Sequence, residues 1–187
     1  MTRNNTFLIT IGTLIIAAAV SRLVPHPPNF TAVGAMAIFG GAYFTRERWL
    51  FLVPFLALWL SDLLLNNIVY QGYVGGFTLF SAHSIPVFIA FGLIVLLSHF
   101  SLRQVSSGRL LGTSLAASVL FFIVTNLGVW LTGTLYPLNS AGLAACFTAA
   151  IPFFANTILG DMFFTGILFS AVWLIQKRSF SKPALHA

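Results

Sequence analysis

The chain has 187 residues, of which 58% are hydrophobic and only 6% are charged. Soluble domains carry roughly 25% charged residues, so this composition excludes an ordinary water-soluble protein and indicates several membrane-spanning helices. The net charge of +6 does not indicate nucleic-acid binding, because the nine Lys and Arg residues are scattered beside apolar segments. The single cysteine, Cys146, excludes an intramolecular disulfide and a Cys-rich metal site.

The apolar segments predict the spans, since a transmembrane helix needs about 20 mostly apolar residues. Five segments qualify: Phe7–Val24, Trp49–Leu65, Phe77–His99, Leu110–Leu131 and Phe154–Gln176. A sixth, Thr31–Phe44, is shorter and rich in Gly and Ala, which is typical of a helix that packs against other helices. Ser140–Ala150, between Pro137 and Pro152, is too short to cross and predicts a short helix at the outer face. We therefore expect an all-α membrane bundle of six transmembrane helices and one short helix, forming a single domain over residues 1–187.

The basic residues predict the orientation. With six crossings, eight of the nine fall on one side: Arg3, Arg46, Arg48, Arg103, Arg109, Lys177, Arg178 and Lys182. Because basic loops stay in the cytoplasm, both termini are expected there, and Arg22 is the one basic residue expected outside. An alternative is that Met1–Val20 is a cleaved signal peptide, which would leave five spans.

Polar groups are expected to gather at the outer ends of the spans. Ionisable groups in a bilayer are costly and mark functional sites, and this topology brings Arg22, Asp62 and Asp161 to one level. The other candidates at that level are His26, Asn29, Asn66, His83, Asn126, Trp130, Tyr136 and Asn156. This one-sided polarity predicts an outward-facing pocket for a compact organic ligand.

Structural roles compete with this interpretation. Arg22 can pair with Asp62 or Asp161 to hold helices together, and His83 can be a hydrogen-bonded core residue. Trp130 and Tyr136 can belong to an interfacial aromatic belt, and Asn126 can join helices.

Several catalytic motifs are missing from the sequence. It contains no Gly-x-x-x-x-Gly-Lys-Ser/Thr loop, no His-Glu-x-x-His and no Gly-x-Ser-x-Gly. We therefore expect neither ATP hydrolysis by the chain itself nor a metal or cofactor site, and we expect no enzymatic activity. A small intramembrane enzyme using Asp62, Asp161 and His83 stays open as an alternative.

Five stretches carry a family resemblance: RLVPHPPNFT from Arg22, FGGAYF from Phe39, LSDL from Leu60, TNLGVWL from Thr125 and AIPFFANTILGD from Ala150. With them the chain resembles, nearly end to end, an uncharacterised bacterial family of six-span proteins described only as transport proteins. More loosely it resembles the S-components of energy-coupling factor transporters, which bind a vitamin or metal-related ligand near the outer face.

The resemblance implies a function. It implies a transport protein of the bacterial inner membrane that binds a small, vitamin-like substrate at the outer polar residues. It also implies a partner, a transmembrane coupling subunit with ATPases, which would meet small residues such as Thr13, Ala17 and Ser21, or Ala37 and Gly41. The chain lacks the family's Ala-x-x-x-Ala pattern in its first span. A solitary, proton-coupled secondary transporter is therefore the alternative.

Overall fold

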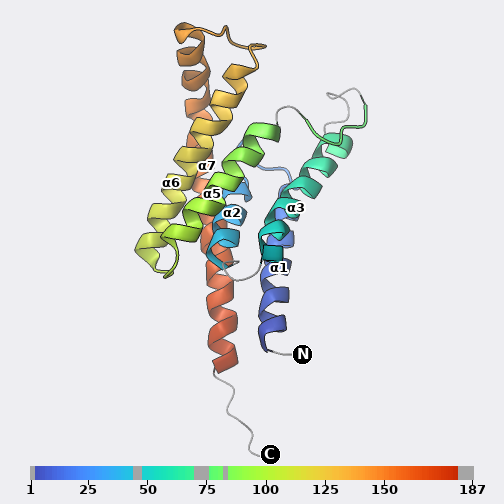
Figure 1. The fold of residues 1–187 in the computed structure, drawn as a ribbon, viewed down its shortest axis with the longest axis vertical. Helices are drawn as coiled ribbons and strands as arrows, with labels where there is room; N and C mark the ends of the chain where they lie inside the picture. The colour runs from blue at the N-terminus through green and yellow to red at the C-terminus, as the bar shows by residue number, and fades with distance from the viewer. Residues whose placement is uncertain (1–2, 44–47, 70–75, 82–83, 181–187) are drawn as a thin grey trace, which may run out of the picture.

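The fold is a bundle of helices. The computed structural model describes residues 3–43, 48–69, 76–81 and 84–180. These ranges contain α1 (Arg3–Ser21), α2 (Val33–Tyr43), α3 (Arg48–Leu64), the π-helical turn η1 (Leu65–Val69), α5 (Ser84–Ser101), α6 (Ser107–Leu131) and α7 (Ser140–Phe180), and no strand. Figure 1 shows the beginning of α1 and the end of α7 at the same end of the molecule, with the connection between α6 and α7 at the other.

The distribution of apolar side chains is that of a membrane protein. On α6, Leu111, Leu115, Val119, Ile123, Leu127 and Leu131 recur every four residues and are all exposed. The opposite face of the same helix buries Thr113, Ser114 and Ser118. In water this arrangement would expose apolar surface and bury polar groups, whereas in a bilayer the apolar stripe faces lipid. The prediction of an all-helical membrane bundle is therefore confirmed.

Within the described residues, four segments are long and apolar enough to cross a membrane: Leu52–Val69, Ser84–Ser101, Ser107–Leu131 and Ser140–Lys177. The first and second predicted spans correspond to shorter apolar helices, Ile9–Ser21 and Val33–Tyr43. All six predicted spans are thus largely helical, while six complete crossings stay a prediction.

Helix α2 lies in the middle of the bundle. It contacts α1, α3, α5, α6 and α7, and residues 33–41 are all buried. Gly41 allows α5 to approach closely, because a Cβ there would lie 2.4 Å from the Val95 carbonyl oxygen of α5. The prediction that this Gly- and Ala-rich segment packs against helices is confirmed. With 11 residues it is only about 16 Å long.

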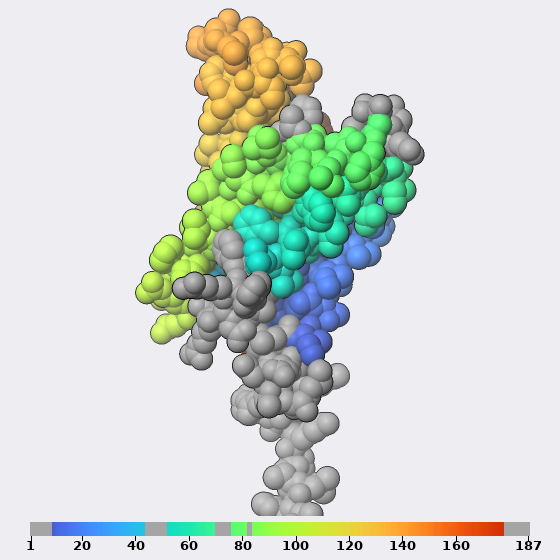
Figure 2. Space-filling model, turned by 45° about the vertical axis from the view of Figure 1, so that its right-hand side comes forward, coloured from blue at the N-terminus to red at the C-terminus, as the bar shows by residue number. Residues whose placement is uncertain are grey.

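Helix α7 corrects the prediction of a separate outer helix. It has 41 residues and continues through Pro152. Proline removes one backbone donor, but helices in membranes tolerate this where neighbouring helices support them. Here α6 gives that support: Phe122 packs on Phe147 and Phe154, on either side of the proline, with ring centroids 5.6 and 4.7 Å apart. Figure 2 shows the ends of α6 and α7, in yellow and orange, extending beyond α5 and α3.

Helix α5 begins later than predicted, at Ser84 instead of Phe77. Within the described residues 76–81, the backbone of Thr78 makes hydrogen bonds of 2.7 and 2.8 Å with the side chain of Asn67 of η1. These bonds satisfy backbone groups that a helix would otherwise have to satisfy.

Candidate functional site

A cavity of about 190 Å³ lies where the connection between α1 and α2 meets α5, α6 and α7. Its polar lining consists of Arg22, Asn29, Thr31, Thr157 and Asp161 together with the backbone of Gly34, and its apolar lining of Val33, Val87 and Phe121. Asn29 is also exposed, which places this connection at the rim of the cavity.

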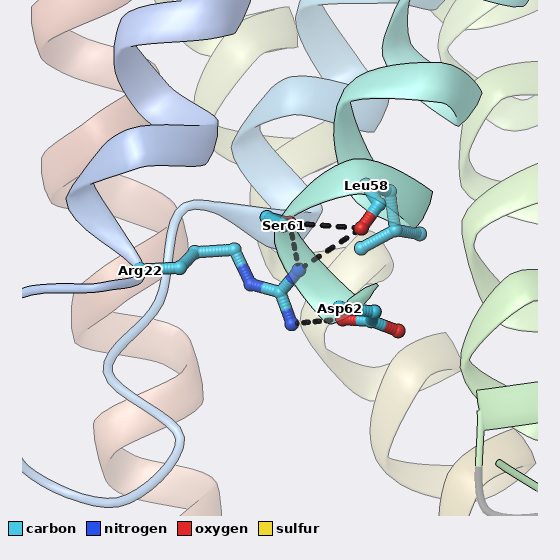
Figure 3. A network of polar contacts seen from close by, with 4 residues as sticks. All are labelled: Arg22, Leu58, Ser61 and Asp62. Atoms are coloured by element: carbon cyan, nitrogen blue, oxygen red, sulfur yellow. Dashed lines mark hydrogen bonds and ion pairs between the residues drawn. The ribbon is translucent and has the colours of Figure 1, made fainter. Parts of the chain in front are cut away.

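Arg22 stands at the end of α1 and reaches across to α3 (Figure 3). One of its terminal nitrogens lies 2.6 Å from Asp62 Oδ1, and the other hydrogen-bonds Ser61 Oγ and, at 3.4 Å, the Leu58 carbonyl. Only 11% of the Arg22 side chain and 14% of the Asp62 side chain are exposed. This ion pair is the structural role that competed with ligand binding, and it joins α1 to α3 at the wall of the cavity.

Asp161 is the buried carboxylate of the site, with 2% of the residue exposed. Its Oδ2 accepts a hydrogen bond of 2.6 Å from the Ser118 hydroxyl of α6, and the backbone N–H of Gly34 donates to the carboxylate. Helix α2 begins after Ala32, whose side chain cannot cap it, so the first N–H groups need an acceptor from elsewhere. Asp161 therefore caps α2 from α7.

Gly34 is required by this contact. A Cβ on Gly34 would lie 2.2 Å from Asp161 Oδ1, well inside van der Waals distance. The absence of a side chain lets the carboxylate approach the backbone at the positive end of the α2 dipole, where a negative charge is stabilised.

The connection before α2 is fastened to α7. The Asn156 side-chain amide donates to the Pro28 carbonyl at 3.0 Å. Phe30 packs on Phe163 and Phe164, with ring centroids 5.8 and 5.7 Å apart. Asn29 has a φ of 64°, the left-handed conformation that Asn adopts more readily than most residues. These contacts hold the rim of the cavity in place.

Three of the residues predicted from the sequence line the cavity: Arg22, Asn29 and Asp161. Two more support it, Asp62 through its ion pair with Arg22 and Asn156 through the Pro28 carbonyl.

Five other predicted site residues do not line this cavity. His26 is exposed, with Nδ1 3.0 Å from the Pro27 carbonyl oxygen. Asn126 donates to its own helix at the Phe122 carbonyl, and Trp130 donates to the Pro137 carbonyl at 3.0 Å. Asn66, in η1, and Tyr136 also lie outside its lining. His83 lies outside the described residues. Asn126 and Trp130 also lie about 12 and 18 Å farther along α6 than Ser118, the partner of Asp161, so the predicted common level is wrong for these two residues.

The sequence reasoning missed Thr31, Thr157 and Ser118. Thr157 carried a usable signal, because it precedes Asp161 by four residues and so lies on the same face of α7. Ser118 carried none, since its role depends on how α6 packs against α7.

The charges of the site do not balance. Arg22 is paired with Asp62, and the described part of the chain records no ion pair for Asp161. The described residues contain no group of three or more His, Cys, Asp and Glu side chains that could hold a metal ion. The ligands that remain are one carboxylate, hydroxyls and amides, which suit polar organic groups or hard cations.

Comparison with known proteins shows the family. Residues 2–185 match the model of a family of unknown function, DUF6580, so the chain belongs to that family. No curated protein and no solved structure matches the chain.

Proposed function

We propose that this member of a family of unknown function is a membrane transport protein that takes a small polar organic substrate into the cavity beside Asp161. The observation that carries the proposal is the lining of the cavity. A buried carboxylate, the Arg22 guanidinium and three uncharged polar side chains converge on one space inside a membrane bundle. Ionisable groups at such positions are costly and typically mark substrate or ion pathways.

The cavity volume narrows the class of substrate. A cavity of about 150 Å³ holds benzene, and pockets for drug-sized ligands measure about 300–1,000 Å³. At about 190 Å³, this cavity fits a ligand little larger than one six-membered ring. We therefore propose a substrate smaller than most vitamins.

Different lining residues would contact the polar and the apolar parts of that substrate. Asp161, Thr157 and Asn29 offer acceptors for its N–H and O–H groups, and Val87 and Phe121 contact its apolar part. The Nε of Arg22 is buried and has no hydrogen-bond partner among the described residues, so it is available to donate. A substrate acceptor would relieve the cost of that unpaired group.

The direction of transport follows from the basic residues. With the basic ends of the bundle in the cytoplasm, the connection carrying Asn29 would face the outside of a bacterial inner membrane. The protein would then capture substrate from the outside.

The energy source has two candidates. In an S-component-like mechanism, a coupling subunit with ATPases would dock on exposed small residues of α1, where Thr13 and Ala17 are exposed. The other surface considered, with Ala37 and Gly41, is buried inside the bundle and cannot meet a partner. In a solitary carrier, a cation would supply the energy, and the uncompensated charge of Asp161 favours this candidate.

A pair of matched threonine variants tests the proposed cavity. The Oγ1 of Thr157 bonds the carbonyl of Phe153, and that of Thr125 bonds the carbonyl of Phe121, each four residues back on its own helix. Only Thr157 lines the cavity. Purified protein is screened by thermal shift against small polar metabolites, and hits are measured again with Thr157→Val and Thr125→Val. The proposal expects Thr157→Val to weaken binding about tenfold, the effect of one lost hydrogen bond, with Thr125→Val binding as wild type. Equal affinity in both variants would place the ligand elsewhere.

A further inference from the structure

Two buried hydroxyls on α6 and α7 have no hydrogen-bond partner in the part of the chain that the structure describes. Ser114 on α6 and Thr165 on α7 are each 2% exposed, and neither Ser114 Oγ nor Thr165 Oγ1 has a hydrogen-bond partner among the described residues. An unpaired buried hydroxyl is costly, and such groups in native structures usually contact a water or an ion.

Both hydroxyls lie one helical turn from the Asp161 carboxylate. Helices α6 and α7 run antiparallel, and the hydrogen bond from Ser118 to Asp161 joins them. Ser114 is four residues before Ser118, and Thr165 is four residues after Asp161. Because the helices are antiparallel, Ser114 and Thr165 lie on the same side of the Ser118–Asp161 hydrogen bond. Residues four apart share a helix face, so both unpaired hydroxyls lie on the faces along which α6 and α7 meet.

We propose that Ser114, Ser118, Thr165 and Asp161 form a binding site for a small monovalent cation such as Na⁺. Four residues rise about 6 Å along a helix. A hard cation lies about 2.3–2.6 Å from its oxygen ligands, so an ion between the two levels binds both the carboxylate and the hydroxyls when these side chains lean toward it from either level. All the ligands are oxygen atoms, which hard cations prefer.

The net charge of the site favours a monovalent cation. Asp161 is the one carboxylate of this group, and the nearby guanidinium of Arg22 is paired with Asp62. A monovalent cation makes the buried group neutral, whereas a divalent cation would leave a net positive charge in a low-dielectric environment.

The cation site would couple ion binding to substrate binding in the cavity. Asp161 belongs both to the cavity lining and to the cation site, so occupation by the ion changes the charge that the substrate meets. This consequence rests on the proposed function. The cation site itself does not, because it is tested without any substrate.

The test uses purified full-length protein in detergent, with NaCl, KCl and choline chloride at equal ionic strength. We expect NaCl to raise the Tm saturably relative to choline chloride, by about 5–10 °C at one hundred times the Kd. Ser114→Ala and Thr165→Val should each reduce this shift to less than half. In choline chloride both variants should be at least as stable as the wild type, since each removes an unpaired hydroxyl.

Ser98→Ala is the matched control. Ser98 is also buried, and its Oγ also has no hydrogen-bond partner among the described residues. It lies on α5, however, where its Cβ faces Gly41 of α2. This variant should keep the full Na⁺ shift. The proposal is overturned if no alkali cation stabilises the wild type, which is the result expected if only an ordered water contacts the two hydroxyls. It is also overturned if Ser114→Ala and Thr165→Val keep the full Na⁺ shift, as Ser98→Ala should. A Na⁺ shift in a protein that binds no metabolite would refute the proposed substrate cavity and keep the cation site.

Discussion

The Asp161 carboxylate of α7 occupies the space over Gly34 of α2 in which a Cβ would lie, 2.2 Å from Oδ1. Two helices that are far apart in the sequence therefore meet through a side chain that is present on one and absent on the other. The contact caps α2 and at the same time forms one wall of the cavity.

Gly34→Ala should be strongly destabilising. The added methyl group must displace Asp161, so the cost combines overpacking with the loss of a helix cap, about 2–4 kcal/mol. Thermal unfolding in detergent, followed by circular dichroism, measures the effect. Gly112→Ala on α6 is the control, because a Cβ there meets nothing within 4 Å; it should be neutral or stabilising by up to about 1 kcal/mol. Equal effects of the two substitutions would contradict the close contact.

Substitutions of Asp161 should show whether stability depends on the hydrogen bonds that its side chain accepts or on its negative charge. Asp161→Ala leaves the Ser118 hydroxyl and the Gly34 N–H without an acceptor and should cost about 2–4 kcal/mol of unfolding free energy. Asp161→Asn keeps an acceptor oxygen of the same size, so its stability in choline chloride should lie within about 1 kcal/mol of wild type. It should also lose the Na⁺ stabilisation, because the charge is gone. If Asp161→Asn and Asp161→Ala are equally unstable without Na⁺, the negative charge itself is needed for folding.

The pair of Arg22 and Asp62 should show strong coupling. Both side chains are mostly buried, at 11% and 14% exposed, so their interaction should exceed the 0–1 kcal/mol of surface pairs. A double-mutant cycle with Arg22→Gln and Asp62→Asn should give about 1–3 kcal/mol of coupling free energy in thermal or denaturant unfolding. Additive effects would mean that the ion pair contributes nothing specific to the contact of α1 with α3.

Cysteine labelling should establish the orientation. In a Cys146→Ala background, His26→Cys and Gln104→Cys each place one thiol at an exposed position on opposite sides of the predicted topology. A membrane-impermeant maleimide added to intact cells of an outer-membrane-permeable strain should label His26→Cys. It should label Gln104→Cys only after lysis. The reverse pattern would place both termini outside the cytoplasm.

The helices could be predicted from the sequence more accurately than the contacts between them. The apolar run Leu110–Leu131 lies within the observed helix Ser107–Leu131, because hydrophobicity and length together identify a span. The break predicted at Pro152 did not occur, since Phe122 of another helix packs on both sides of it. A proline's local effect is visible in a sequence, but the neighbouring helix that offsets it is not.

The candidate site shows the same limit. Arg22 and Asp161 were found because an ionisable group in a membrane is costly wherever it points. Asn126 and Trp130 were predicted at the same level, but they lie eight and twelve residues beyond Ser118, the α6 partner of Asp161, and bond to the Phe122 and Pro137 carbonyls. The topology places a residue in one half of the bilayer, whereas its depth and its partners depend on the lengths and packing of the helices.

The burial of α2 has a consequence for biogenesis. At about 16 Å, this helix is too short to be inserted into a bilayer as an independent span. Its N-terminal cap, Asp161, is synthesised more than 120 residues after Gly34, which at about 5–20 residues per second takes roughly 6–25 s. Until α7 is synthesised the segment lacks this acceptor and the packing of α7, although α5, against which it packs most, is already present. We therefore expect α2 to reach its final place only when α7 is inserted. In a Cys146→Ala background, nascent chains truncated before Asp161 should leave Met36→Cys, buried in the full chain, accessible to water-soluble maleimide.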